Sequence, residues 1–214
     1  MPNGFDTVQN CAANANAIRN AQYDFVARYL SIDLYDDPPH PKVIGRDEAN
    51  AIWNAGLKLV LVYEDAPSSC DYFSALRGYI DGLRAATQAG DLGARNGGLY
   101  FTVDYDAPAA DIDGCITSYF HGVASGVAAA GNGNRRYGIG VYGSGSTCRA
   151  MQQAGLVQYT WLANSAGWSG YDPSRPWSIV QQAQTTISLD CGTMHVDPDT
   201  ASANFGAFVP PAAG

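Results

Sequence analysis

Two stretches decide the fold: residues 57–64, which read LKLVLVYE, and residues 98–106, which read GLYFTVDYD. Each begins as a mostly apolar run of strand length and ends in carboxylates, and such runs are typical of strands buried on both faces of a parallel sheet. Between them, residues 74–89 carry apolar side chains at helical spacing and precede Gly90, which predicts a helix that ends there. The two stretches therefore predict a β–α–β unit.

The same alternation continues in both directions along the chain. We expect further strands at residues 4–7, 25–30, 137–142, 157–163, 177–184 and 193–196, and further helices at residues 11–21, 46–55, 111–130 and 147–153. Eight parallel strands joined by right-handed crossovers can close into a barrel. The predicted fold is an α/β protein, a single (β/α)8 barrel over residues 1–205 with shortened or missing helices in its second half. Residues 206–214 read as a linker-like tail. An open doubly wound sheet is the alternative, but no Gly-rich dinucleotide loop supports it.

Composition narrows the functional classes. The chain has 214 residues, with 12 basic against 20 acidic side chains and a formal net charge of −8. Binding of nucleic acid needs many phosphate-neutralising side chains, and only Arg135 and Arg136 stand together, so we expect no such partner. No apolar run reaches the roughly 18 residues of a membrane span, so none is predicted. We expect a monomer.

The cysteines and histidines do not indicate a metal site. The five cysteines are Cys11, Cys70, Cys115, Cys148 and Cys191. None is spaced as Cys-x-x-Cys, and His40, His121 and His195 share no metal-ligand spacing, so we expect no metal and no cofactor. An odd number permits at most two disulfides, and free thiols in the core fit the wide spacing equally well.

Carboxylates gather where the expected strands end. Asp6, Glu64, Asp104, Asp106 and Asp197 each close a strand, and the carboxyl ends of barrel strands build the mouth of the barrel. Because side chains alternate along a strand, Asp104 and Asp106 should point the same way. Crowded carboxylates raise at least one pKa, which supplies the proton donor and the charged carboxylate that glycoside hydrolysis requires. Helix caps and turns are the competing structural explanation for each of them.

Other side chains are candidates for binding a sugar. The set that we expect to contact substrate is Arg28, Tyr105, Tyr142, Trp161, Gln181 and Asp197. Aromatic faces and amide groups suit sugar rings and hydroxyls, although such residues also serve as packing. Ser144, in VYGSGST, lies outside the Gly-x-Ser-x-Gly pattern of a nucleophile elbow, so we do not expect it to be a nucleophile.

The order of these motifs resembles one family. GFDT (4–7), FVARYL (25–30), LYFTVDYD (99–106), YGIGVYGSGSTC (137–148) and WLANSAGW (161–168) resemble the glycoside-hydrolase-like barrels known as domain of unknown function 1906, which are related to the family 25 lysozymes. The resemblance implies that Asp6 matches the Asp of the first strand and Asp104 the first half of an Asp-x-Glu pair. Asp106 stands where the family 25 lysozymes have the proton-donating Glu, so either the sugar sits closer, Glu64 replaces it, or catalysis is lost. Asp197, in HVDPD, resembles the Asp that closes the last strand.

The resemblance implies a peptidoglycan-cleaving glycoside hydrolase of the muramidase type, with bacterial cell-wall glycan as its partner. Because this substrate lies outside the cytoplasm, we expect a secreted or extracytoplasmic protein, although residues 1–10 show no features of a signal peptide. Two alternatives stay open. One is a non-catalytic module that binds cell-wall glycan, and the other is a hydrolase of a different glycan.

Overall fold

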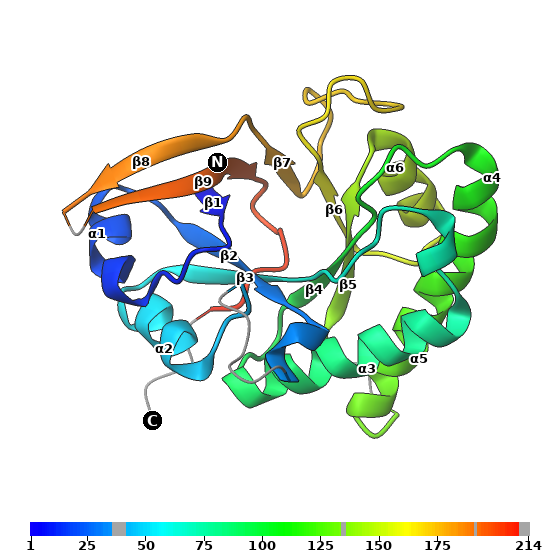
Figure 1. Ribbon diagram of the computed structural model, residues 1–214, viewed down its shortest axis with the longest axis horizontal. Coiled ribbons are helices and arrows are strands. Elements are labelled where there is room, and N and C mark those ends of the chain that lie inside the picture. The colour runs from blue at the N-terminus through cyan, green and yellow to red at the C-terminus, as the bar shows by residue number, and fades with distance from the viewer. Residues whose placement is uncertain (36–41, 134–135, 191, 210–214) are drawn as a thin grey trace.

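The central sheet of the computed structural model closes into a barrel of eight strands (Figure 1). The structure describes residues 1–35, 42–133, 136–190 and 192–209. The strands are β1 (Asn3–Asp6), β2 (Phe25–Leu30), β3 (Lys58–Tyr63), β4 (Gly98–Thr102), β5 (Gly138–Gly143), β6 (Tyr159–Leu162), β7 (Ile179–Gln181), β8 (Thr185–Leu189) and β9 (Gly192–Ala201). Strands β1 to β7 are parallel neighbours in chain order, and β9 closes the ring between β7 and β1. The predicted α/β barrel is confirmed.

The closing strand runs the other way. β9 is antiparallel to both β1 and β7, so the expectation of eight parallel strands is wrong at this position. β8, which the sequence did not reveal, pairs with β9 alone and forms a two-stranded arm above α1 in the view of Figure 1. Because two residues separate β8 from β9 in the sequence, these two strands are antiparallel; parallel neighbours need a long crossover.

Helices cover the first five strands and are missing from the last ones. The helices are α1 (Ala15–Asn20), α2 (Arg46–Asn54), α3 (Ala75–Leu92), α4 (Ala109–Asp111), α5 (Thr117–Ala130) and α6 (Gly145–Gln153), with a π-helical segment at Ile112–Ile116 and 3-10 turns at Ala12–Asn14, Ile32–Tyr35 and Cys70–Tyr72. No helix follows β6 or β7 among the described residues, as predicted. α3 continues past Gly90 and ends at Gly93, whose φ of +87° is the left-handed conformation of a helix C-cap.

Two layers of core follow from the alternation of side chains along the strands. Residues Phe25, Ala27, Val60, Val62, Tyr100, Trp161 and Ile179 point into the barrel. The intervening residues, such as Val26 and Leu61, point outward to the helices. Because the side chains of one strand face both layers, the strands read as continuous apolar runs in the sequence.

The end of the barrel away from the mouth is filled by the chain that follows β9. Phe205 and Phe208 are buried, the Tyr100 hydroxyl donates to the Phe205 carbonyl at 2.8 Å, and Phe208 pairs with Leu59. Ala201 N–H donates to the Pro2 carbonyl, so the first residues lie at this same end. Residues 206–208, which the sequence assigned to a linker-like tail, therefore pack as part of the barrel.

Helices α3 and α5 approach each other through glycines. A Cβ added at Gly78 would lie 2.0 Å from the Tyr119 carbonyl oxygen, and one at Gly126 would lie 2.1 Å from that of Tyr79. Side chains at these positions would therefore push the helix backbones apart. The small residues that the sequence shows in this region are a packing surface.

Some predicted features lie outside the described residues: the proline-dense segment 36–41 with His40, Arg135, Cys191 and the end of the tail at 210–214. Among the helices that are described, none has both the length and the apolar character to cross a membrane.

Candidate active site

A cavity of about 260 Å³ opens at the carboxyl ends of the parallel strands. Every strand of the closed ring contributes to its wall: Asp6 (β1), Tyr29 (β2), Val62 and Glu64 (β3 and the residue after it), Thr102 and Asp104 (β4 and the loop after it), Tyr142 (β5), Trp161 (β6), Gln181 (β7) and Asp197 (β9). The acids lie on β9, β1, β3 and β4, whereas β5, β6 and β7 supply aromatic rings and an amide. The structure thus brings together seven of the predicted site residues.

Asp6 is the most enclosed carboxyl group of the cavity wall. Its side chain is 1% exposed, and its two oxygens accept hydrogen bonds from the Tyr29 hydroxyl at 2.7 Å and the Gln181 amide at 2.8 Å. Burial raises its pKa to about 7, with the two hydrogen bonds opposing that rise and the charges of Asp197 and Glu64 adding to it. Asp6 therefore exchanges a proton near neutral pH.

Glu64 is held as one half of an ion pair. Lys42 Nζ lies 2.7 Å from Glu64 Oε2, and the two side chains are 17% and 22% exposed. The neighbouring Asp65 points away from the cavity, where it accepts hydrogen bonds from the Ser31 hydroxyl and pairs with Arg77. These contacts fix the start of the loop that follows β3.

Asp104 and Asp197 stand on opposite walls, because β4 and β9 lie across the ring from each other. Partial burial raises the pKa of each. The sequence placed Asp197 at the end of a strand, but it lies in the middle of β9, paired with Asp6. Asp197 reaches the mouth because β9 is antiparallel to its neighbours, so that the first half of β9 projects beyond the mouth.

Asp199, a residue that sequence reasoning missed, contacts the cavity wall through Trp161. Trp161 is 1% exposed and donates its indole N–H to Asp199 at 3.0 Å. Burial raises the pKa of Asp199 well above its usual value, with the charges of Asp6 and Asp197 adding to the rise. Asp199 follows Asp197 by two residues, so the alternation of a strand would have placed both on one face.

Gln181 is committed to other side chains of the site. Its amide oxygen accepts from the Tyr142 hydroxyl at 3.0 Å and from Asn164 N–H at 3.2 Å, while its amide nitrogen donates to Asp6. It therefore orients Asp6 rather than being free for substrate. Tyr29, the second donor to Asp6, was also missed, although it lies two and four residues after the inward-facing Ala27 and Phe25.

Two predicted residues after β4 lie outside the cavity. The Asp106 carboxylate accepts hydrogen bonds from the Ser169 N–H at 2.8 Å and hydroxyl at 3.1 Å, and the Tyr105 hydroxyl donates to Asp111 at 2.9 Å. The expectation that Asp104 and Asp106 share a face fails because β4 ends at Thr102 and the chain turns before Asp106. Asp106 joins two loops in the described structure.

Arg28 does not contact the cavity either. It points out of the barrel and is fully buried against α2, where its Nε donates to Glu48 Oε1 at 2.6 Å. Glu48, which is 2% exposed, also accepts from Cys11 N–H at 2.8 Å. The prediction that Arg28 binds substrate is wrong, because Phe25, Ala27 and Tyr29 are the residues of β2 that face inward.

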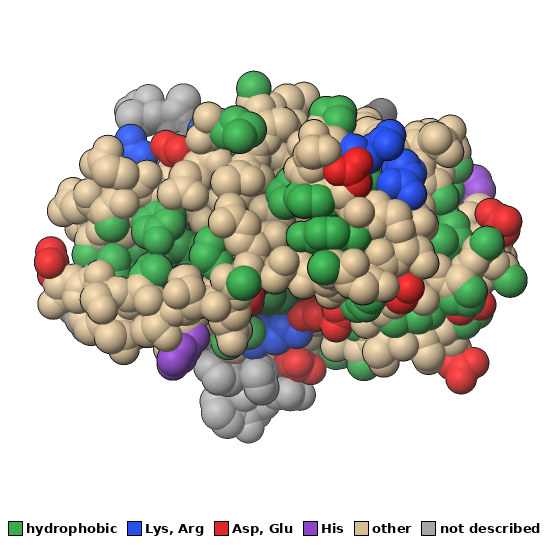
Figure 2. All heavy atoms as spheres, turned by 90° about the horizontal axis from the view of Figure 1, so that it is seen from above, with side chains coloured by type: hydrophobic (Ala, Val, Ile, Leu, Met, Phe, Trp, Pro, Cys, Tyr) green, Lys and Arg blue, Asp and Glu red, His purple; other side chains and the backbone are tan. Residues whose placement is uncertain are grey.

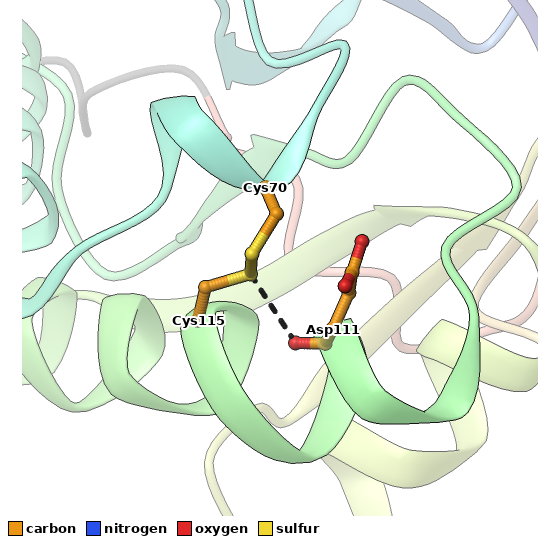
Figure 3. Close-up of side chains that lie close together, drawn as sticks. All are labelled: Cys70, Asp111 and Cys115. Carbon is orange, nitrogen blue, oxygen red and sulfur yellow. Dashed lines mark hydrogen bonds between the residues drawn. A yellow bond between two sulfur atoms is a disulfide. The ribbon is translucent and has the colours of Figure 1, made fainter.

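A disulfide ties the loops at the mouth together. Cys70, in the loop after β3, is bonded to Cys115, in the π-helical segment after β4 (Figure 3). Cys11 and Cys148 are free and buried. Asp111 lies beside this disulfide (Figure 3), and these three residues form the single metal-like cluster in the described part of the chain. Because both sulfurs are bonded to each other, they are not available as metal ligands.

The remaining candidates have structural partners. Ser144 caps α6 by accepting from Thr147 N–H at 3.1 Å, and His195 Nδ1 lies 3.1 Å from the Thr186 hydroxyl across the β8–β9 hairpin.

The surface view shows acidic side chains beside basic ones near the lower edge of the face in Figure 2, next to the grey residues.

A closed α/β barrel whose mouth is lined by carboxylates from several strands is the architecture expected of a glycoside-hydrolase-like domain. The model of the family described as Rv2525c-like, glycoside hydrolase-like domain matches residues 16–201, and the chain belongs to this family. The resemblance to a glycoside-hydrolase-like family is thereby confirmed, while the relation to family 25 lysozymes stays a prediction.

Relatives extend this finding. The chain is 32% identical to the protein YbfG of Bacillus subtilis (strain 168) over 196 residues, which cover 88% of this chain and 27% of YbfG. It is 28% identical to FadG of the same organism over 197 residues, which cover 88% of this chain and 33% of FadG. The chain thus spans a third or less of the length of these relatives.

Solved structures show the same fold. The Mycobacterium tuberculosis Tat-secreted protein Rv2525c, in complex with L-tartrate, superposes with a TM-score of 0.76 at 22% identity, covering 97% of this chain and 98% of that one. A protein of B. stearothermophilus gives a TM-score of 0.65 at 19% identity, covering 95% and 97%.

Proposed function

We propose that the domain is a glycoside hydrolase in which Asp6 supplies the proton for bond cleavage. The observation that carries this proposal is the position of Asp6, which is buried in the wall of a cavity whose other walls hold Glu64 and Asp104. The pKa of about 7 that burial gives Asp6 supports it. A protonated carboxyl group facing charged carboxylates is the arrangement that glycosidases use. Tyr29 and Gln181 hold Asp6 in place through its two oxygens.

The proposed chemistry balances without a cofactor. Asp6 gives its proton to the glycosidic oxygen, and the bond from this oxygen to the anomeric carbon breaks. Glu64 or Asp104 stabilises the positive charge that develops on the sugar ring. Water then adds its hydroxyl to the anomeric carbon, and its remaining proton restores the acid form of Asp6. The sequence suggested Glu64 or Asp106 as the proton donor, and this proposal assigns that role to Asp6 instead. Asp106 has no part in it because Ser169 holds it outside the cavity.

We further propose bacterial cell-wall glycan as the substrate, cleaved in the manner of a muramidase. Membership of a glycoside-hydrolase-like family supports a sugar ligand. The half-buried Tyr142 in the wall opposite the acids supports it as well, since aromatic rings pack against sugar faces. The proposed location is outside the cytoplasm. The Cys70–Cys115 disulfide supports it, because disulfides persist in oxidising compartments, as does the Tat-secreted Rv2525c.

The test is digestion of purified peptidoglycan sacculi, followed by mass spectrometry of new reducing ends. We expect fragments from the wild type, and about 10²- to 10⁴-fold fewer from Asp6→Asn, which is the usual contribution of a general acid. Asp106→Asn is the matched control and should keep most of the activity. Absence of fragments from the wild type, or equal rates for wild type and Asp6→Asn, would reject the proposal.

The second candidate is a module that binds cell-wall glycan without cleaving it. The observation that favours it is the displacement of Asp106 from the cavity, which leaves one carboxylate after β4 where a muramidase has two. Pull-down with insoluble peptidoglycan beside the digestion assay separates the two, because binding without fragments selects the module. A panel of other glycans in the same assay tests the remaining possibility, a hydrolase of a different glycan.

A further inference from the structure

Lys42 reaches the cavity from the segment between β2 and α2. Its ammonium group lies 2.7 Å from the Glu64 carboxylate, donates to the Glu64 carbonyl at 3.3 Å, and stands 4.9 Å from the centre of the Tyr29 ring. Tyr29 in turn holds Asp6. One cation thus contacts two residues of the cavity wall.

Several acidic groups share the cavity with Glu64. The acidic groups that face it from the other elements around the cavity are Asp6 (β1), Tyr29 (β2), Asp104 (after β4), Tyr142 (β5) and Asp197 (β9). The ionised forms of these groups are repelled by a carboxylate. Among the described residues, Lys42 is the cation that pairs with Glu64, and its charge also acts to lower the pKa of Asp104.

Other basic side chains close in sequence are engaged elsewhere. Arg28 pairs with Glu48 outside the barrel, and Arg77 pairs with Asp65 and Asp81. Lys58, the other lysine of the chain, lies over the Phe205 ring at the opposite end of the barrel. Lys42 therefore acts on the cavity in a way that Lys58 does not, which makes Lys58 a matched control.

We propose that Lys42 is a positioning residue of the site: it keeps the Glu64 carboxylate charged and fixed at the cavity wall, and so leaves the delivery of the proton to Asp6. This inference rests on the proposed function and deepens it, because it assigns different roles to the two carboxyl groups. It also answers the alternative left by the sequence, in which Glu64 is the acid. An ammonium group at 2.7 Å stabilises the form of Glu64 that has no proton to give.

The composition of the chain allows a direct test that does not depend on activity. Glu48 and Glu64 are the two glutamates of the sequence, so protein labelled with ¹³C at the glutamate carboxyl carbon gives two signals to follow by NMR as the pH is varied. Glu64→Gln removes one signal and assigns both. The titration is then repeated for Lys42→Met, Lys42→Arg and the control Lys58→Met.

We expect the Glu64 midpoint to lie at higher pH in Lys42→Met than in the wild type, because the change removes a positive charge that lies 2.7 Å from the carboxylate. Lys42→Arg should restore most of the shift, while Lys58→Met should leave the Glu64 midpoint where it is. Equal Glu64 midpoints in Lys42→Met and Lys58→Met would overturn the proposal, whatever the activity of the protein.

Kinetics give a second readout once a glycan that the protein cleaves has been identified. The acid limb of the pH–rate profile should move to higher pH in Lys42→Met and stay in place in Lys58→Met, since more Glu64 becomes protonated at a given pH. A uniform loss of rate at every pH would show a structural role only and would contradict the proposal. Absence of cleavage in the wild type would reject the proposed function but leave the NMR result standing.

Discussion

Asp6 combines near-complete burial with two hydrogen bonds to its oxygens, and these influences oppose each other. Burial disfavours the charged carboxylate, whereas the Tyr29 hydroxyl and Gln181 amide favour it. The effect of burial on the pKa is the larger one, so the proton stays on Asp6 to a higher pH in the folded protein than in the unfolded chain. The same property that suits Asp6 to proton transfer makes it a source of pH-dependent stability.

The first prediction follows from that linkage. The pKa of Asp6 is about 7 in the fold against 3.8 in the unfolded chain, so the folded protein binds more protons between these values and its stability falls as pH rises through them. In Asp6→Asn this contribution disappears. We expect the free energy of unfolding of the variant, relative to wild type, to increase by up to about 1.4 kcal/mol per pH unit between pH 5 and 7. Urea unfolding at several pH values measures it, and parallel curves for the two proteins would contradict the cause assigned here.

Arg28 gives a second prediction at this scale. Removing it, as in Arg28→Met, leaves the Glu48 carboxylate buried without its ionic partner, and we expect a loss of about 3–5 kcal/mol in the free energy of unfolding. Glycan affinity of the remaining folded protein should be unchanged, because Arg28 does not line the cavity. Chemical denaturation beside a binding assay checks both parts. A drop in affinity without a drop in stability would restore the substrate-binding role that the sequence suggested.

Side-chain alternation explains which residues could be predicted from sequence. Asp6, Tyr142 and Trp161 reach the cavity because each ends or lines a regular strand, where the period of two holds. The period fails for Asp106, which lies beyond the end of β4 in a loop whose path depends on a contact with Ser169, 63 residues later in the chain. Contacts between distant loops of this kind leave no local pattern in the sequence.

At the scale of elements, the strands were predictable but the direction of the last one was not. A short apolar segment shows that a strand is present, whereas its direction depends on what connects it to its neighbours. The connection after β8 is short, and β8 itself is too exposed to give a hydrophobic signal. The barrel therefore closes with one antiparallel strand, and Asp197 reaches the mouth from the middle of that strand rather than from its end.

The packing of α3 on α5 gives a third prediction. Gly78→Ala places a methyl group against the Tyr119 carbonyl, so we expect a loss of about 1–3 kcal/mol in the free energy of unfolding. Gly90→Ala, in the same helix, meets no atom closer than the Tyr137 hydroxyl at 3.9 Å and should be neutral or stabilising by up to about 1 kcal/mol. Thermal or urea unfolding of the pair measures the difference. Similar effects of both changes would show that helix propensity, rather than close approach, governs α3.

At the scale of the whole molecule, the Cys70–Cys115 disulfide joins the loops that follow β3 and β4 across a separation of 45 residues. We predict that the double variant Cys70→Ser, Cys115→Ser loses about 2–4 kcal/mol in the free energy of unfolding, because the unfolded chain is no longer cross-linked. A reducing agent should destabilise the wild type and leave the double variant unchanged, which is the control. Equal responses of both proteins to the reducing agent would contradict this assignment.

The closing of the barrel has a consequence for how the domain can be attached to something else. Pro2 and Ala201 are hydrogen-bonded, and Phe208 packs beside the start of β3, so the described ends of the chain lie on the side opposite the cavity. An affinity tag, a bead or a neighbouring module joined at either of these ends would be attached to the side of the barrel opposite the cavity. Its opening would then face away from the point of attachment and stay accessible.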